Sequence, residues 1–191
     1  MADQIVSNSL KDILGGRNLY LIGMMGSGKS LTGPLLAKGI AYGFVDSDQV
    51  IEKAAKKTIS EIFEDDGESS FREIETQVLK EIGQLYSLVV ATGGGVVTRP
   101  ENWGILHQGI VVWIDPGRNR LLSRLNLEDP SRPMLNTNNS LSSFDQLYKD
   151  REVLYMEADL KIPVADESPE EVACKILDNL PAILNDSANQ A

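Results

Sequence analysis

The sequence predicts an α/β fold in which a parallel sheet is covered by helices on both faces. Five short apolar runs alternate along the chain with longer amphipathic stretches. The runs are apolar throughout and do not alternate with polar residues, which is expected of strands buried on both sides. The five predicted strands are Leu19–Ile22, Phe44–Val45, Leu88–Ala91, Ile110–Ile114 and Leu160–Val164.

Start signals place two of the predicted helices. Ser70 with Glu73 and Ser168 with Glu171 have the spacing of a capping box, in which a hydroxyl and a carboxylate satisfy free N–H groups of the first turn. An apolar stripe at helical spacing follows each box, so both helices should pack against the sheet. In another helical stretch, Pro34 lacks an N–H and crowds the preceding turn, which predicts a kink or loosened turn.

Length and composition indicate one domain over residues 1–191. Hydrophobic residues make up 42% and charged residues 24% of the chain, within the range of globular proteins. The stretch 126–143 is rich in Asn, Ser, Pro and Asp with little periodicity, and we predict a lid at about residues 125–138. The polar end, residues 185–191, is expected to fray.

The charge balance limits the possible partners. Eighteen basic against twenty-eight acidic residues give a net charge of -10, which repels nucleic acid and anionic membranes, and no basic run offsets it. The single cysteine, Cys174, excludes an internal disulfide, and neither a secretory signal nor a membrane-spanning run is present. We expect a monomer in the cytoplasm, without nucleic-acid or membrane partners; import into an organelle after processing stays open.

Residues 23–30 have the pattern of a phosphate-binding loop, two glycines separated by four residues and followed by Lys and Ser. The loop follows a predicted strand and precedes a helical stretch, as this motif requires. Glycines let the backbone approach a triphosphate, and N–H groups at the helix start point at it. A glycine-rich turn without a ligand is the alternative. The residues expected to contact ATP or its Mg²⁺ ion are Gly26, Ser27, Gly28, Lys29 and Ser30.

Two carboxylates follow the second predicted strand. Asp46 and Asp48 are two residues apart, so both can face the cleft at the strand end. In phosphoryl transfer, one such acid helps to hold magnesium and another accepts the proton of the acceptor hydroxyl. We predict that Asp46 and Ser30 hold Mg²⁺ and that Asp48 is the base, although Asp48 can also act as a helix cap. The third strand ends in Thr92 where a Walker B aspartate is expected, which again favours Asp46.

These motifs together resemble the shikimate kinase family. Its members have a P-loop, an Asp-x-Asp after the second strand, a Phe-Arg-x-x-Glu segment, a triple glycine and arginines in and beyond the lid. The sequence matches this series from about residue 18 to residue 162. The corresponding segments are Asp46–Asp48, Phe71–Glu75, Gly93–Gly95, Arg132–Leu135, and Arg151 with Tyr155.

The resemblance implies a three-layer P-loop kinase fold with strand order 2-3-1-4-5 and an acceptor-binding region at about residues 49–75. It also implies transfer of the γ-phosphoryl group of ATP to the 3-hydroxyl of shikimate, with Mg²⁺, in chorismate and aromatic amino acid biosynthesis. Lys29, Asp48 and Arg132 would be catalytic, and Arg124 would lie near the adenine. The residues implied to bind shikimate are Asp48, Arg72, Gly93, Gly94, Gly95 and Arg151.

Simpler interpretations of some of these residues remain open. Arg72 and Glu75 can form a surface ion pair, the three glycines can serve a tight loop, and Arg132 can be solvated. The sequence also departs from the family pattern at Pro34, Leu31 and Met134. Another small-molecule kinase of this architecture, acting on gluconate or a nucleoside monophosphate, is the main alternative. A non-catalytic binding protein of the same family is the second.

Overall fold

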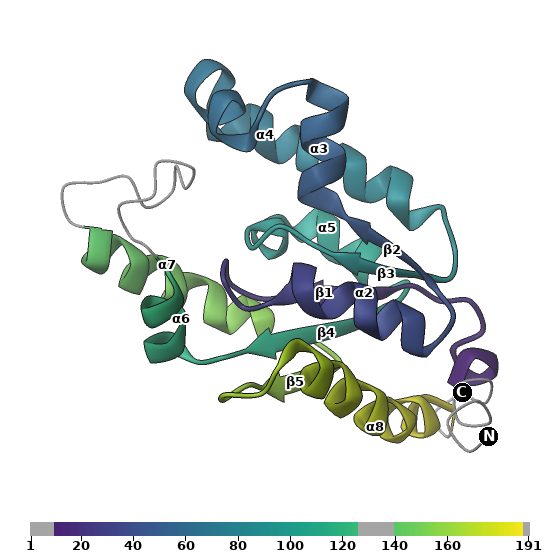
Figure 1. The fold of residues 1–191 in the computed structure, drawn as a ribbon. Helices are drawn as coiled ribbons and strands as arrows, with labels where there is room; N and C mark the ends of the chain where they lie inside the picture. Colours follow the sequence, from purple (N-terminus) through teal and green to yellow (C-terminus); the bar gives the residue numbers. More distant parts are fainter. Residues whose placement is uncertain (1–9, 126–139, 189–191) are drawn as a thin grey trace.

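The computed structural model describes residues 10–125 and 140–188 and contains the predicted parallel sheet (Figure 1). Its five strands lie in the order β2-β3-β1-β4-β5, so the predicted order is confirmed. All four neighbouring pairs are parallel. The strands are β1 (Leu19–Ile22), β2 (Gly43–Asp46), β3 (Leu88–Ala91), β4 (Ile110–Asp115) and β5 (Leu160–Pro163).

Helices cover both faces of the sheet, and each face has its own core. Along β1, Leu19 and Leu21 point to one face, while Tyr20 and Ile22 point to the other. The first face packs against α2 and α8, and the second against α4, α5 and α7 (Figure 1). The helices are α2 (Lys29–Gly39), α3 (Ser47–Ala55), α4 (Ile59–Gly83), α5 (Pro100–Leu106), α6 (Arg118–Arg124), α7 (Ser140–Tyr155) and α8 (Pro169–Ala188), with a 3₁₀ turn η1 at Val96–Thr98.

Helix α2 continues through Pro34, where a kink or loosened turn was predicted. The helix is assigned without interruption from Lys29 to Gly39, with Pro34 inside it. Its first turn is fixed by Gly28, whose carbonyl accepts hydrogen bonds from the N–H groups of Leu31 and Thr32. Packing of α2 against the sheet and α8 therefore maintains the helix despite the missing N–H.

The predicted helix start at Ser70 is wrong. Helix α4 begins at Ile59, and its capping box is formed by Thr58 and Glu61. Ser70 is three residues past Gly67, where the helix is interrupted, so it lies in the first turn of the segment that follows and not at the start of that segment. At Gly67 the backbone leaves the helical region, with φ 80° and ψ 170°, so α4 consists of two segments that meet at this glycine.

The capping box predicted at the last helix is confirmed. The N–H of Ser168 donates to the Glu171 carboxylate at 2.7 Å, and the N–H of Glu171 donates to Ser168 Oγ at 3.2 Å. Helix α8 continues to Ala188, so the backbone of residues 185–188, predicted to fray, is helical. Residues 189–191 lie outside the described part. No helix in the described ranges combines the length and hydrophobicity needed to cross a membrane.

Asn18 joins the start of β1 to the turn before β3. Its side chain donates from Nδ2 to the Leu85 carbonyl at 2.8 Å and accepts from the Leu88 N–H at 3.0 Å. The residue is only 5% exposed, so water cannot readily replace these bonds. This bridge fixes β1 and β3 as neighbours at the end of the sheet opposite the P-loop.

Replacement of Asn18 should therefore destabilise the fold. We expect Asn18→Ala to lower the free energy of unfolding by about 2 kcal/mol, because it leaves a buried N–H and a buried carbonyl without partners. Urea-induced unfolding measures the change. Asn179→Ala is the matched control, since that exposed side chain bonds only to its own helix at Lys175. Equal stability of the two variants would contradict this account of Asn18.

Candidate active site

The loop between β1 and α2 is shaped by glycines. Gly28 caps α2 with φ 102°, a left-handed conformation that residues with a Cβ atom rarely adopt. At Gly23, φ is 138° and a Cβ atom would lie 2.5 Å from the carbonyl oxygen of Ile114. The loop can therefore pass close to β4 and end at the N-terminus of α2, where unpaired N–H groups attract phosphate.

Lys29 lies folded back over this loop. Its ammonium group donates to the carbonyls of Gly23 and Met24 at 2.7 and 2.9 Å and to Ser27 Oγ at 3.2 Å. The residue is buried, and burial lowers the pKa of Lys29 to about 8, although the charge of Asp48 opposes this shift. The Lys29 ammonium group therefore already lies in the phosphate-binding loop. Phosphate oxygens can replace its present hydrogen-bond acceptors.

Ser30 and Asp46, the two predicted magnesium ligands, contact each other directly. Ser30 Oγ donates to Asp46 Oδ2 at 2.6 Å. The other carboxylate oxygen of Asp46 caps α3 by accepting from the N–H groups of Asp48 and Gln49 at 3.0 and 3.4 Å. Asp46 is therefore the helix cap, and the alternative interpretation of Asp48 as the cap is wrong. The last residue of a strand still has extended geometry, which a cap requires and Asp48, inside α3, lacks.

The oxygen atoms of Ser30 and Asp46 fit Mg²⁺. This ion prefers oxygen ligands, keeps several waters and takes one or two protein groups together with substrate phosphates. The described residues contain no group of three or more His, Cys, Asp or Glu side chains placed to hold a metal ion. Thr92, at the usual Walker B position, donates its hydroxyl to the Leu21 carbonyl at 2.9 Å and so has a structural partner.

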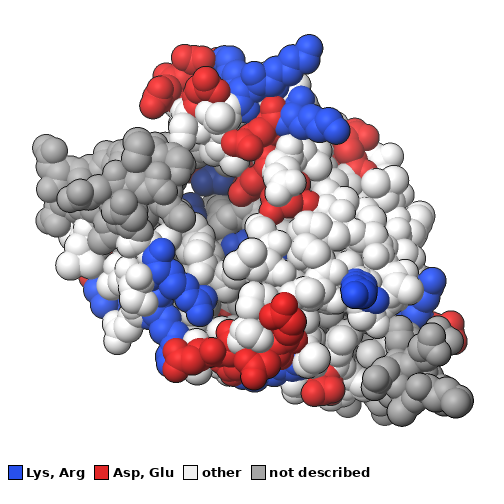
Figure 2. Space-filling view, in the orientation of Figure 1, with Lys and Arg blue, Asp and Glu red and all other residues white. Residues whose placement is uncertain are grey.

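A cavity of about 720 Å³ lies beside α3 and α4, and it meets the P-loop at Met25. In Figure 2 the molecule is hollowed next to these helices, and atoms of basic residues are visible inside. Four predicted groups face the cavity together: Asp48, Arg72, the triple glycine and Arg151. Met25 also lines it, together with residues from the acceptor-binding region predicted at about residues 49–75, and these are Glu52, Thr58, Ile59, Ser60, Glu61, Phe63 and Glu64.

Asp48 points into this cavity with an unsatisfied oxygen. Oδ1 is buried and has no hydrogen-bond partner. Burial, together with the charge of Asp46, raises the pKa of Asp48 to about 6, against the opposing charge of Lys29. A carboxylate with this pKa is mostly ionised at neutral pH and accepts a proton more readily than an exposed aspartate.

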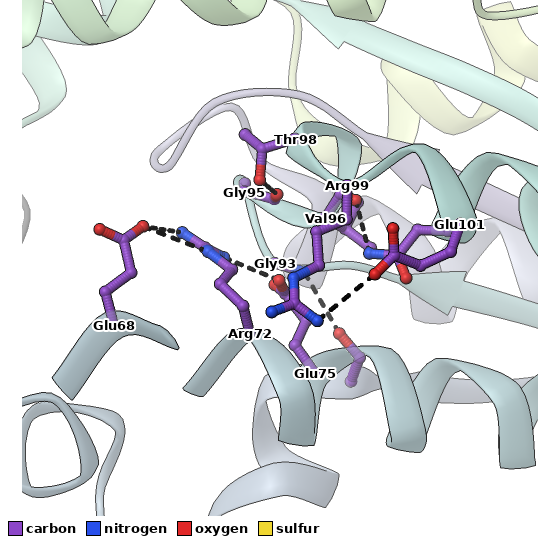
Figure 3. Close-up of polar contacts among 12 residues, drawn as sticks. Glu68, Arg72, Glu75, Gly93, Gly95, Val96, Thr98, Arg99 and Glu101 are labelled. Carbon is purple, nitrogen blue, oxygen red and sulfur yellow. Dashed lines mark hydrogen bonds and ion pairs between the residues drawn. The ribbon is translucent and has the colours of Figure 1, made fainter. Parts of the chain in front are cut away.

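Arg72 and Glu75 form an ion pair, but the pair is buried (Figure 3). Arg72 donates to Glu75 at 2.7 Å and also reaches Glu68 at 3.2 Å. Glu75 is 2% exposed, so the interpretation of this contact as a surface ion pair is excluded. Burial raises the pKa of Glu75, while the charge of Arg72 lowers it. The guanidinium is thus held rigidly at the cavity wall.

Gly93, Gly94 and Gly95 are needed because neighbouring atoms leave little room for a Cβ atom, and not because of their backbone conformation. None of Gly93, Gly94 and Gly95 has a positive φ. A Cβ atom at Gly95 would overlap the Arg72 guanidinium, and one at Gly93 would lie 2.6 Å from Glu75 Oε1. The tight-loop interpretation is therefore insufficient, because charged side chains fill the space beside Gly93 and Gly95, and the backbone of Met25 and Gly23 passes close to Gly94.

Arg151 approaches the same glycines from α7. A Cβ atom at Gly94 would lie 3.5 Å from its Nη1. Arg151 is 3% exposed, its Nε has no hydrogen-bond partner, and burial lowers its pKa. Tyr155, one turn further along α7, donates to the Gly94 carbonyl at 2.6 Å and fixes the helix against the loop. A buried guanidinium with a free donor needs an anionic or polar ligand.

A second, smaller cavity of about 220 Å³ lies on the outer side of the P-loop. Arg124 lines it and donates to the Gly26 carbonyl at 3.5 Å, and its contact with the adenine stays a prediction. Arg132 and the lid predicted beyond Leu125 lie outside the described residues. Leu125 itself is buried and faces Gly26.

The sheet order, the P-loop and the paired carboxylate and guanidinium groups define a P-loop kinase of small molecules. The chain belongs to the shikimate kinase family, because the family model described as shikimate kinase matches residues 25–181. A shikimate kinase of Prochlorococcus marinus strain NATL2A is 56% identical over 191 residues, covering 100% of this chain and 96% of its own. One from strain MIT 9211 is 61% identical over 171 residues, covering 90% and 86%.

Solved structures agree with this assignment. A shikimate kinase from Acinetobacter baumannii in complex with shikimate matches with a TM-score of 0.85 and 37% identity, covering 91% of this chain and 97% of that one. A gluconokinase from Sinorhizobium meliloti matches with a TM-score of 0.56 and 15% identity, covering 92% and 98%. The latter likeness concerns the fold alone. Like its family, the chain is an ATP-dependent phosphotransferase.

The raised pKa of Asp48 makes a prediction about stability. The folded state penalises the charged carboxylate, so this penalty is present above about pH 6 and disappears below the pKa of 3.8 that an aspartate has in the unfolded chain. We expect Asp48→Asn to stabilise the protein by about 2 to 3 kcal/mol at pH 8, since the two pKa values differ by about two units and each unit corresponds to about 1.4 kcal/mol. Thermal unfolding at pH 8 and pH 4 measures this. A variant that is less stable at pH 8 would refute the prediction.

Proposed function

We propose that the chain transfers the γ-phosphoryl group of ATP to the 3-hydroxyl of shikimate, giving shikimate 3-phosphate and ADP in chorismate and aromatic amino acid biosynthesis. The main support is that two buried guanidinium groups, Arg72 and Arg151, line one cavity with the carboxylate of Asp48. This arrangement suits a small acid with several hydroxyls, since arginine forks bind carboxylates and acidic oxygens accept from hydroxyls.

The acceptor would be oriented by groups whose hydrogen bonds are incomplete. Asp48 Oδ1 and Glu75 Oε1 are both buried without partners, and both face the space beside Gly93. Hydroxyl groups of a bound acceptor can donate to these oxygens. Arg151 Nε is likewise free to donate to a carboxylate. Ligand binding would thus satisfy polar atoms that the folded protein leaves unpaired.

ATP would place its phosphates along the P-loop and the N-terminus of α2. Lys29 would exchange the carbonyls of Gly23 and Met24 for phosphate oxygens. Ser30 and Asp46 would hold Mg²⁺, directly or through water. When bound, this ion neutralises charge on the phosphates. Arg132 and Arg124 are proposed to contact the phosphates and the adenine respectively, on the basis of the family pattern.

The proton of the acceptor hydroxyl would pass to Asp48. As the hydroxyl oxygen bonds to the γ-phosphorus, the bond from this phosphorus to the bridging oxygen breaks, and ADP leaves with the electron pair. A pKa near 6 makes the Asp48 carboxylate a suitable proton acceptor at neutral pH. The proposal extends to a cytoplasmic monomer without nucleic-acid or membrane partners, in keeping with the net charge of -10.

The first test measures ADP formation from ATP and Mg²⁺ with single acceptors. We expect shikimate to stimulate ADP formation strongly, and gluconate and AMP to have little effect, because only shikimate matches the family's acceptor. Faster turnover of gluconate or AMP would reassign the acceptor and leave phosphoryl transfer intact. No stimulation by any of them would favour the non-catalytic binding protein.

The pH dependence of the reaction tests Asp48. We expect kcat/KM for shikimate to fall about tenfold per pH unit below about pH 6, because protonated Asp48 cannot accept the hydroxyl proton. Asp48→Asn should lower kcat by roughly 10²- to 10⁴-fold and remove this pH dependence. Asp178→Asn, on the exposed face of α8, is the control for the change in charge. Full activity of the Asp48 variant would show that another group is the base.

A further inference from the structure

The position of the acceptor cavity determines where the nucleoside of ATP must lie. In-line transfer requires the γ-phosphate to face the acceptor, so the rest of the nucleotide extends away from it. The smaller cavity meets the P-loop at Gly26, Ser27 and Gly28, whereas the acceptor cavity meets it at Met25, so the smaller cavity is assigned to the nucleoside. Its far wall comes from the connection between β5 and α8, through Val164, Glu167 and Pro169.

This connection, residues 164–168, has few backbone hydrogen bonds of its own. The N–H of Val164 donates to the Asp115 carbonyl at 2.8 Å, and the N–H of Ala165 donates to the Glu167 carboxylate at 2.5 Å. The Glu167 side chain therefore joins two points of the connection. Because Glu167 also lines the cavity, a group that fixes this side chain also fixes the cavity wall.

Lys175 holds both ends of the connection from α8. Its ammonium group donates to the Pro163 carbonyl at 2.6 Å and to Glu167 Oε1 at 3.0 Å. Lys175 itself does not line the cavity, whereas Glu167 does. One cation thus joins the last residue of β5 to the side chain that shapes the wall.

We propose that Lys175 is a positioning residue for the nucleotide: by binding the Pro163 carbonyl and the Glu167 carboxylate, it fixes the wall of the nucleoside cavity. The proposal rests on the proposed function. Loss of Lys175 would weaken ATP binding in two ways. The connection would lose its tie to α8, and Glu167 would become an uncompensated negative charge beside a cavity that receives an anion.

The ionisation of Glu167 supports this arrangement. The hydrogen bond with Lys175 is the main cause that lowers the pKa of Glu167 to about 2. Hydrogen bonds from the backbone N–H groups of Ala165 and Glu167 lower it further. The carboxylate therefore stays charged, and paired with Lys175, throughout the neutral range. On the opposite side, Arg120 from α6 reaches Asp166 at 3.3 Å, but Asp166 is almost fully exposed and this pair is correspondingly weak.

Steady-state kinetics with both substrates varied test the proposal. We expect Lys175→Met to raise KM for ATP about fivefold, with kcat and KM for shikimate within twofold of the unaltered protein. Lys175→Arg should restore most of the affinity, because arginine can donate to the same two oxygens. Lys80→Met, on the exposed end of α4, removes the same charge and should change neither KM. Thermal unfolding accompanies each variant.

A double-variant experiment separates pairing from a general effect of Lys175. In a Glu167→Gln background, Lys175→Met should raise KM for ATP less than it does in the unaltered protein, because the charge to be compensated is absent and only the bond to the Pro163 carbonyl is lost. Calorimetric titration with ADP and Mg²⁺, without an acceptor, should show the same pattern in Kd. This binding readout does not depend on which acceptor is phosphorylated, so it remains valid if the shikimate assignment fails.

Two results would overturn the proposal. One is an unchanged KM for ATP and an unchanged Kd for ADP in Lys175→Met. The other is an equal rise of both KM values together with a lower unfolding temperature, which would indicate general destabilisation. In contrast, absence of shikimate-dependent ADP formation by the unaltered protein, with a normal effect of Lys175→Met on ADP binding, would reject only the proposed acceptor.

Discussion

Burial of charge at the carboxyl edge of the sheet is the constraint on which the rest of the structure depends. Lys29, Arg72, Glu75 and Arg151 are each less than 9% exposed and lie around one loop cluster. Charges removed from water are costly unless each has a well-placed partner. The parallel sheet meets this requirement because β1, β2 and β3 all end at the same edge, so a short loop from each strand can supply a partner.

Not every partner is supplied, and the unsatisfied atoms are concentrated at the cavity. Asp48 Oδ1, Glu75 Oε1 and Arg151 Nε have no hydrogen bond, although they are buried. The close approach of Gly93 to the two carboxylates keeps them at the cavity wall. Burial of these unpaired atoms lowers the stability of the ligand-free protein. A polar ligand that forms hydrogen bonds with them restores that stability. The same atoms therefore account for local instability and for affinity.

Much of the fold and part of the site could be predicted from the sequence, because the strands and P-loop have strong local patterns. The pairing of Ser30 with Asp46 followed from strand ends that share one edge. The helix start at Ser70 was wrong because the interruption of α4 falls at Gly67, where glycine adopts a positive φ, and capping-box spacing does not report that position. The role of Lys175 was not predicted, since its partners depend on how a patternless connection folds.

In a protein with a net charge of -10, acidic side chains near the two cavities would repel anionic ligands. Both ligand sites must attract anions, yet each contains acidic side chains. In the larger cavity Glu75 is paired with Arg72, and at the smaller one Glu167 is paired with Lys175. Pairing removes the repulsion that an isolated carboxylate would exert, and it fixes the geometry of the wall at the same time. An acidic residue can thus shape a site for an anionic ligand where a cation is paired with it, as at Glu75 and Glu167.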